Sequence, residues 1–339
     1  MILNFFMNLE LKFSIIIPVY NRPSEIEELL ESLTLQKFEK DFQVLIIEDG
    51  SDRASEDVVN TYKDKLNVDY YIKDNSGPGL SRNFGMQKAT GNYYIILDSD
   101  CILPAKYLIE VEKGLTTNYT DAFGGPDASH QSFTNIQKAI NYAMTSLLTT
   151  GGLRGNKNSV NTFQPRSFNM GISKEAFQKT NGFSSQRYGE DIDLSLRLIE
   201  YNFNTQLISE AFVYHKRRTT LAHFFKQTFN FGAARPILNK QHPNTSKITY
   251  WFPSLFVVGL VCSIVFLLIG IPYFLWFYGI YLSLIFIDSL IQNKNIVVAV
   301  LSSITTLVQF FGYGLGFLRS NFRLQSGKSI RATFPEMFG

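Results

Sequence analysis

Two aspartates, Asp98 and Asp100, end the apolar run in NYYIILDSDCILP, which covers residues 92–104. Carboxylates this close repel each other and are costly to bury, so we expect a positive group between them. On an extended segment, residues i and i+2 point the same way. Two oxygen ligands on one side suit Mg²⁺ or Mn²⁺, which complete their coordination with water and a substrate diphosphate. The alternative interpretation is a helix cap or turn before Pro104.

A second acidic pair, Glu190 and Asp191, stands in YGEDIDLSLRL, at the start of a run with an apolar helical face. The dipole at a helix N-terminus favours negative charge, so capping is one interpretation, and Asp193 fits it. The other interpretation is a general base, because a carboxylate held in a cleft can take a proton from an acceptor hydroxyl. The residues alone leave both open.

Buried strands must position these acids. Strands are predicted for four apolar runs: FSIIIPV (13–19), FQVLIIEDGS (42–51), VDYYIK (68–73) and NYYIIL (92–97). Helical stretches separate them, which predicts an α/β fold with a mainly parallel sheet and helices on both faces. A further strand is expected in QLISEAFVYH (206–215). Ligands of such sheets bind beyond the carboxyl ends of the strands, where Asp49 and the Asp98/Asp100 pair fall.

The motifs, taken in order, resemble glycosyltransferase family 2 over roughly residues 12–240. They are FSIIIPVYNR, VLIIEDGSDR, GLSRNFGMQKATGNYYIILDSD, NGF, YGEDIDLSLRL and VYH. The resemblance implies the GT-A fold, which is Rossmann-like. It also implies an inverting transfer of a sugar from a nucleoside diphosphate sugar, UDP- or GDP-linked, with a divalent metal, Mn²⁺ or Mg²⁺, on the diphosphate.

The resemblance implies a role for each matching residue. Asp191 would be the general base, with Glu190 beside it. Asp100 and Asp98 would hold the metal, and Asp98 could contact the ribose instead. His215, which ends VYH, resembles a metal-ligating histidine of some members, although a lone histidine at a strand end is otherwise usually structural. The nucleotide would contact Pro18, Tyr20, Arg22, Asp49, Arg82, Asn83 and Asp98, with Asp49 on the base.

The C-terminal third of the 339 residues differs in composition, because between Trp251 and Leu318 only Asp288 and Lys294 are charged. Three apolar runs there, 251–270, 273–291 and 296–318, are each near the ~20 residues that span a bilayer. Basic residues after the last run belong in the cytoplasm by the positive-inside tendency. Three spans would place the basic C-terminal residues and a cytoplasmic catalytic domain on opposite sides of the membrane. The number of spans is therefore left open at two or three, and with two spans one apolar segment would be re-entrant or interfacial.

Basic and aromatic residues alternate in HKRRTTLAHFFKQTFNFGAAR (215–235), which predicts an interfacial helix. Gln227 and Arg235 resemble part of the Gln-x-x-Arg-Trp segment of processive polysaccharide synthases. The tryptophan is missing and the spacing differs, so an anchoring helix is favoured. Gln227 and Arg235 could still contact a phosphate or the acceptor.

We therefore predict a catalytic domain over 1–215, an amphipathic helix and linker over 216–250, a transmembrane region over 251–318 and a basic tail over 319–339. The net charge of +3 is too weak to argue for nucleic acid. The expected function is sugar transfer to a lipid-linked saccharide or polyprenyl phosphate, for surface glycan, at the cytoplasmic (inner) membrane. The alternatives are a processive synthase and a non-catalytic scaffold or transporter. The sugar, the acceptor and the oligomeric state are left open.

Overall fold

The predicted strands form one sheet that brings the acidic motifs to a common edge. The computed structural model describes residues 10–130, 132–151 and 163–338. Seven strands take the order β3-β2-β1-β4-β8-β6-β9. Their bounds are β1 (Phe13–Val19), β2 (Gln43–Asp49), β3 (Val68–Lys73), β4 (Tyr93–Leu97), β6 (Ala122–Gly124), β8 (Asn169–Ser173) and β9 (Thr205–Leu207). The strands β1 to β4 pair in parallel and β8 runs antiparallel to its neighbours, which confirms the predicted mainly parallel α/β fold.

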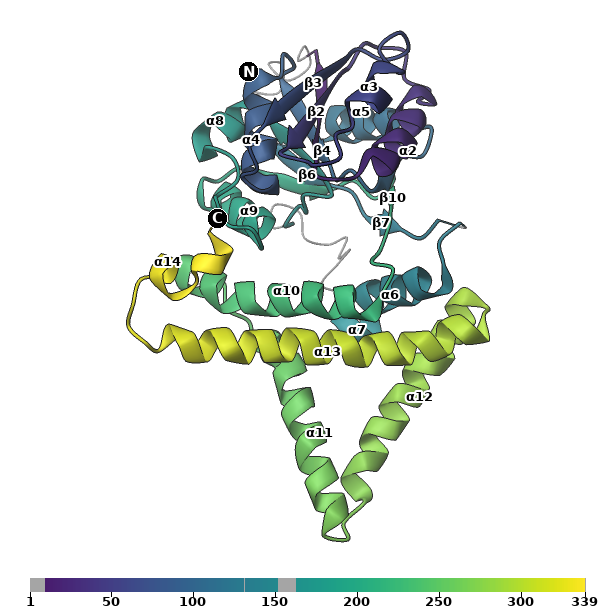
Figure 1. Ribbon diagram of the computed structural model, residues 1–339, viewed down its shortest axis with the longest axis vertical. Helices are drawn as coiled ribbons and strands as arrows, with labels where there is room; N and C mark the ends of the chain where they lie inside the picture. Colours follow the sequence, from purple (N-terminus) through teal and green to yellow (C-terminus); the bar gives the residue numbers. More distant parts are fainter. Residues whose placement is uncertain (1–9, 131, 152–162, 339) are drawn as a thin grey trace. The chain divides into compact units, whose positions relative to one another are not determined.

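Successive side chains of the central strands point to opposite faces, and both faces are covered. In β1, Ile15 and Ile17 pack into one apolar core and Ile16 into the other. The first core includes side chains from α2 (Pro23–Thr34), α3 (Glu56–Asn60) and α5 (Tyr107–Thr117). The second includes those from α4 (Pro78–Lys88), α8 (Lys174–Thr180) and α9 (Glu190–Glu200). Figure 1 shows the ribbons of these helices beside the sheet. This double covering explains why the strand sequences are apolar throughout rather than alternating.

The strand order changes direction at β1, because β2 and β3 lie on one side of it and β4 lies on the other. In parallel α/β sheets, such a switch point opens a crevice at the carboxyl ends of the two strands. A second sheet, of order β5-β10-β7, begins beside it with β5 (Cys101–Ile102), β10 (Val213–His215) and β7 (Asp127–Ala128). The prediction of one strand over 206–215 is wrong, because a turn in which Ala211 donates to the Ile208 carbonyl separates β9 from β10.

The remaining helices form a second compact unit. We call unit 1 the described residues up to Ala128, those from 163 to His215, and Phe338, and unit 2 those between Ser129 and 151 together with Lys216–Met337. The main helices of unit 2 are α6 (Asn135–Thr145), α7 (Leu147–Thr150), α10 (Leu221–Gln241), α11 (Phe252–Leu268), α12 (Tyr273–Asn293) and α13 (Ile296–Leu324). Its shorter helices are η2 (Ile248–Trp251), α14 (Ile330–Thr333) and η3 (Pro335–Met337). Three stretches, Ile248–Leu268, Tyr273–Asn293 and Ile296–Leu324, are long and apolar enough to cross a membrane.

The end of the predicted catalytic domain at residue 215 coincides with a boundary of unit 1, but α6 and α7 group with the C-terminal helices. Polar contacts join them there. Tyr142 of α6 donates to a carboxylate oxygen of Asp288 on α12 at 2.5 Å, and Thr305 of α13 donates to the Ala139 carbonyl at 3.1 Å. The other domain limits stay a prediction.

Candidate active site

Asp100 stands just beyond β4, between the side chains of Arg22 and His215. Arg22, which follows β1, donates from Nη1 to Asp100 Oδ2 at 2.6 Å. His215 Nε2, at the end of β10, lies 3.2 Å from Asp100 Oδ1. Burial opposes ionisation of this carboxyl, but His215 and Arg22 outweigh it and hold the pKa of Asp100 well below its usual range. Part of the positive charge that the paired aspartates require therefore comes from Arg22.

Asp98 points to a different partner. Residues 98–101 form a turn in which the Cys101 amide donates to the Asp98 carbonyl at 3.1 Å. The prediction that an extended segment would direct both carboxylates the same way is therefore wrong. Asp98 instead accepts a hydrogen bond from Arg82 Nη2 at 2.7 Å. Metal ligation by Asp98 stays a prediction, as does its contact with the ribose.

The geometry around Asp100 and His215 fits a divalent cation. Among the described residues, Asp100, Cys101 and His215 form the group whose donor atoms all lie within 4.8 Å of one another. Asp100 Oδ1 and His215 Nδ1 are buried without a hydrogen-bond partner. Cys101 suits the role less well, because burial raises the pKa of its thiol well above the usual value and metals bind the thiolate. One oxygen and one nitrogen ligand would remain, leaving room for diphosphate oxygens and water.

A buried arginine joins the two acidic motifs. Arg82 of α4 is 3% exposed. Its Nη2 donates to Asp98 at 2.7 Å and its Nη1 donates to Glu190 Oε1 at 3.0 Å. The Phe183 ring lies under the guanidinium, 5.2 Å from its centroid. Arg82 is thus the positive group between Asp98 and the second acidic motif. Glu190 of that motif lies 108 residues after Arg82 in the sequence.

Glu190 and Asp191 begin α9, as expected, but their surroundings differ. Glu190 is buried, and burial followed by the Asp191 charge raises its pKa to about 7, against the opposing effect of Arg82. Asp191 is partly exposed, accepts from the Ile192 amide at 2.8 Å, and has Arg166 Nη1 3.8 Å from its Oδ2. The partly exposed carboxylate is the better placed of the two to meet a substrate.

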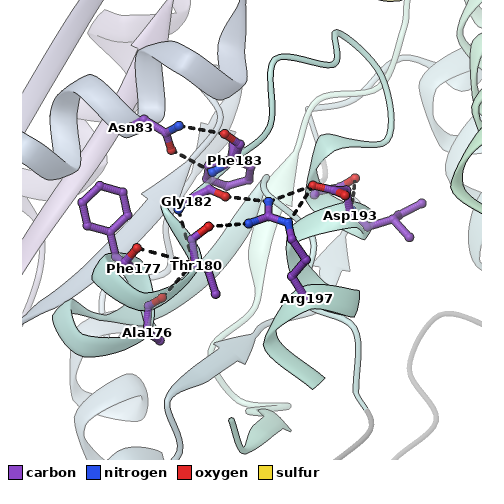
Figure 2. Close-up of polar contacts among 10 residues, drawn as sticks. Asn83, Ala176, Phe177, Thr180, Gly182, Phe183, Asp193 and Arg197 are labelled. Atoms are coloured by element: carbon purple, nitrogen blue, oxygen red, sulfur yellow. Dashed lines mark hydrogen bonds and ion pairs between the residues drawn. The ribbon is translucent and has the colours of Figure 1, made fainter. Parts of the chain in front are cut away.

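The loop before α9 is braced from both sides, as Figure 2 shows. The side-chain amide of Asn83 donates to the Phe183 carbonyl and accepts from the Phe183 amide, both at 2.8 Å. Arg197 donates to the carbonyls of Thr180 and Gly182 at 2.6 Å and pairs with Asp193 at 2.7 Å. Asn83 therefore has a structural role that the sequence analysis missed, and nucleotide contact by Asn83 stays a prediction.

The carboxyl ends of β1 and β2 hold the other predicted nucleotide residues. Pro18 is buried within β1 and pairs with Ile47, whereas Tyr20, just after the strand, is 50% exposed. Asp49 accepts from Lys73 Nζ at 2.6 Å, and from the amides of Ser76 and Gly77 at 2.9 Å. These bonds fix the segment that leads into α4. Base recognition by Asp49 and nucleotide contacts of Pro18 and Tyr20 stay predictions.

Gln227 and Arg235 lie on α10, in unit 2. Gln227 is half-buried, and the Arg235 guanidinium lies over the Tyr250 ring, 4.4 Å from its centroid. This packing within unit 2 supports the anchoring interpretation of the helix. A contact of Gln227 or Arg235 with a phosphate or acceptor stays a prediction.

Sequence reasoning missed three neighbours of these groups. Asp127 Oδ2 of β7 lies 4.0 Å from His215 Nδ1, Phe168 stacks on the His215 ring at 4.9 Å, and Arg166 approaches Asp191. All come from the stretch between 120 and 170, whose strands are short and interrupted. An aspartate directly after the glycines and proline of GGPD was the available signal for Asp127.

Similarity to known proteins identifies the family of the chain. The sequence model described as Glycosyl transferase family 2 matches residues 14–180. An uncharacterized glycosyltransferase of Haemophilus influenzae is 31% identical over 218 residues, which cover 62% of this chain and 70% of that protein. The chain belongs to glycosyltransferase family 2. The predicted family is thereby confirmed.

Other curated and solved proteins also resemble the chain. The GalNAc(5)-diNAcBac-PP-undecaprenol beta-1,3-glucosyltransferase of Campylobacter jejuni is 30% identical over 116 residues, 33% of this chain and 37% of that protein. The alignments cover about a fifth of two further curated relatives, from Rickettsia felis and Staphylococcus aureus. Mannosyltransferase PcManGT of Pyrobaculum calidifontis, solved with GDP-Man and Mn²⁺, is 13% identical and has a TM-score of 0.58 over 92% of this chain and 88% of its own. That likeness confirms the expected fold.

Replacing Arg82 tests whether it holds the two motifs together. Arg82→Met should lower the free energy of unfolding by about 3–5 kcal/mol, because Asp98 and Glu190 would lose a buried counter-ion. Arg53→Met, at an exposed arginine after β2, should change it by less than about 0.5 kcal/mol. Urea unfolding of both variants gives the comparison. Equal effects would mean that Arg82 is not a structural bridge.

Glu190 should give the enzyme an unusual pH profile of stability. Its pKa of about 7 in the fold exceeds the ordinary value of 4.5, so the folded state binds more protons between those values. The free energy of unfolding should therefore fall as pH rises from about 4.5 to 7, by on the order of 2–3 kcal/mol from this group. The measurement is the slope of the free energy of unfolding against pH, compared between the wild type and Glu190→Gln. A wild-type slope equal to that of the variant contradicts the assignment.

Proposed function

We propose that the protein is an inverting glycosyltransferase. Its donor is a nucleoside diphosphate sugar, linked to UDP or GDP, and its acceptor is a membrane-associated lipid-linked saccharide or polyprenyl phosphate. Family membership supports sugar transfer, and the named lipid-linked substrate of the Campylobacter jejuni relative supports the acceptor class. The membrane-spanning potential of unit 2 supports an acceptor held in the bilayer.

One observation carries the proposal, namely that Arg82 joins the segment of Asp98 and Asp100, which we propose binds the cation, to the start of α9, where the proposed base Asp191 stands. Asp100 pairs with Arg22 and His215, whereas Asp191 follows Glu190, which Arg82 ties to Asp98. In a transferase with a diphosphate leaving group, a cation stabilises the leaving diphosphate and a base accepts the proton of the attacking hydroxyl. The arrangement supplies them without a covalent nucleophile.

In the proposed reaction, the acceptor oxygen attacks the anomeric carbon of the donor sugar. The bond from that carbon to the β-phosphate oxygen breaks, and the nucleoside diphosphate leaves with the electron pair. Asp191 receives the proton of the acceptor hydroxyl. A single displacement from the face opposite the leaving group inverts the anomeric centre.

The developing negative charge on the diphosphate requires positive partners. Asp100 and His215 would hold a divalent cation, Mn²⁺ or Mg²⁺, which when bound stabilises charge on the leaving group. Arg22, 2.6 Å from Asp100, is placed to move from that carboxylate to a phosphate oxygen. Glu190, held against Arg82, keeps the start of α9 in place, and Asp191 with it.

The proposed location is the cytoplasmic (inner) membrane, with unit 1 on the cytoplasmic side. Nucleotide sugars are made in the cytoplasm, so the donor site must face it. Basic residues follow the last apolar helix, among them Arg319, Arg323, Lys328 and Arg331. Such clusters stay on the cytoplasmic side of membranes.

The direct test is turnover by the full chain in membranes. We expect release of UDP or GDP from one sugar of a panel of nucleotide sugars, dependent on an added polyprenyl phosphate or lipid-linked saccharide. Membranes that contain Asp191→Asn serve as the blank. Release that is unaffected by this substitution, or absent with every donor, rules the proposal out.

The base assignment makes a sharper prediction. Asp191→Asn should lower turnover about 100–10,000-fold and leave nucleotide affinity near the wild-type value, because the amide keeps the shape and loses the basicity. Asp193→Asn, two residues along the same helix, weakens the pair with Arg197 and should lower stability with little effect on turnover of the folded enzyme. Steady-state rates and nucleotide titrations of both variants decide. A collapse of affinity in Asp191→Asn would assign that residue to binding.

The metal assignment is tested by binding as well as by rate. Asp100→Ala and His215→Ala should each weaken the Mn²⁺-dependent part of UDP or GDP binding at least tenfold, because each removes one ligand of the cation. Titration calorimetry with and without Mn²⁺ measures this part. Wild-type protein with chelator should bind like Asp100→Ala. Full activity of the wild type in chelator contradicts the assignment.

A further inference from the structure

The three apolar helices of unit 2 differ in how much of their surface is covered. In the most apolar part of each stretch, 22% of Ile248–Leu268 and 11% of Tyr273–Asn293 is buried, against 39% of Ile296–Leu324. α11 and α12 thus expose apolar side chains around most of their circumference, as a helix in lipid does. α13 exposes a narrower stripe that includes Val297, Val300, Ile304, Leu315 and Phe322.

Most of the remaining cover of α13 comes from α10, which runs beside it in Figure 1, and α6, α11 and α12 also contact it. The two backbones approach so closely that glycine is required. A Cβ at Gly232 of α10 would lie 2.0 Å from the Tyr313 carbonyl oxygen. A Cβ at Gly312 or Gly316 of α13 would lie 2.1 Å from Thr228 Oγ1 or the Phe229 carbonyl oxygen. α13 therefore cannot enter the bilayer without α10.

α10 is not built for the bilayer interior. It carries Lys226, Arg235 and Lys240, and α6, which also bonds to α13 through Thr305, adds Lys138. Lys226 and Lys240 are exposed. Charged side chains at the centre of a bilayer are costly and rare. A spanning α13 would carry the basic residues of its two partners into hydrocarbon.

The length of α13 agrees with a different placement. Its 29 residues extend about 43 Å at ~1.5 Å per residue, well beyond the ~30 Å hydrocarbon thickness. Ile248–Leu268 and Tyr273–Asn293 have 21 residues each, close to the requirement for one span. Asp288 and Lys294, the charged residues near the end of α12, lie beside the start of α13, and Asp288 bonds to α6.

We propose that the chain crosses the membrane twice, through the α11–α12 hairpin, and that α10 and α13 lie together in the plane of the lipid interface. The exposed stripe of α13 would contact acyl chains and the basic residues would contact lipid headgroups. Two crossings return the chain to the side from which it started. The proposal thereby removes the conflict between three apolar runs and a basic tail on the same side as the catalytic domain. It concerns topology alone and does not depend on the proposed enzymatic activity.

Single cysteines test the number of crossings. In full-length protein with Cys101→Ala and Cys262→Ser, we would introduce Asn60→Cys in unit 1, Ile271→Cys between α11 and α12, or Ser326→Cys after α13. A membrane-impermeant maleimide is applied to intact cells without an outer membrane and to inverted vesicles. Asn60 and Ser326 should label from the same side, and Ile271 from the other.

Either of two outcomes overturns the proposal. Labelling of Ser326 from the same side as Ile271 would show three crossings. Labelling of all three positions from one side would show none. Nucleotide binding or activity, measured for the cysteine-free parent and for each variant, identifies proteins that have not folded. A reporter fused to the C-terminus of the unmodified chain gives an independent measurement of the side of the membrane on which residue 339 lies.

Depth measurements separate an interfacial α13 from a buried one. Ile304 lies about a third of the way along α13 and Leu284 near the middle of α12, and both are exposed. A fluorophore on Ile304→Cys should be quenched most by lipids labelled near the headgroup. The same fluorophore on Leu284→Cys should be quenched most by lipids labelled deep in the acyl chain. Equal deep quenching at both positions contradicts an interfacial α13.

Discussion

The ion triad of Arg82, Asp98 and Glu190 is the contact on which the candidate site depends. Arg82 is 3% exposed and has lost most of its water, and two carboxylates at 2.7 and 3.0 Å, together with the Phe183 ring, compensate for that loss. Because the carboxylates follow β4 and begin α9, satisfying Arg82 fixes the distance between two elements that are far apart in sequence. The cost of leaving any member unpaired makes this geometry rigid, so that the segment of Asp98 and Asp100 is held at a fixed distance from the start of α9.

The scaffold places these groups by strand order rather than by local sequence. β1 and β4 are neighbours at the switch point, so Arg22 and Asp100 meet although 78 residues separate them. The three-stranded sheet then adds His215, because β10 pairs with β5 in a register that sets His215 opposite Cys101. Each of these two partners of Asp100 thus follows or ends a different strand. Together they lower the pKa of Asp100, although burial opposes ionisation of its carboxyl.

Much of this could be predicted from the sequence, and the failures share a cause. Long apolar runs identified β1, β2 and β4, and the acids at the start of a helical pattern identified the beginning of α9. The turn at 98–101, the split of 206–215 into two sheets and the approach of Arg166 to Asp191 could not be predicted. These depend on two- and three-residue strands whose pairing is decided by distant partners, and such strands leave too short a pattern to recognise.

The same limit applies to the membrane region, where composition alone makes α11, α12 and α13 equivalent. Apolar length says that a helix could reside in lipid, but the free energy of insertion also depends on what is packed against it. α13 is joined to a helix with three basic residues through contacts that tolerate no Cβ, so the two must share one environment. An interface satisfies both, since it accepts apolar side chains on one side and solvates charge on the other. The charged residues of α10 therefore decide where α13 lies relative to the membrane more strongly than the hydropathy of α13 does.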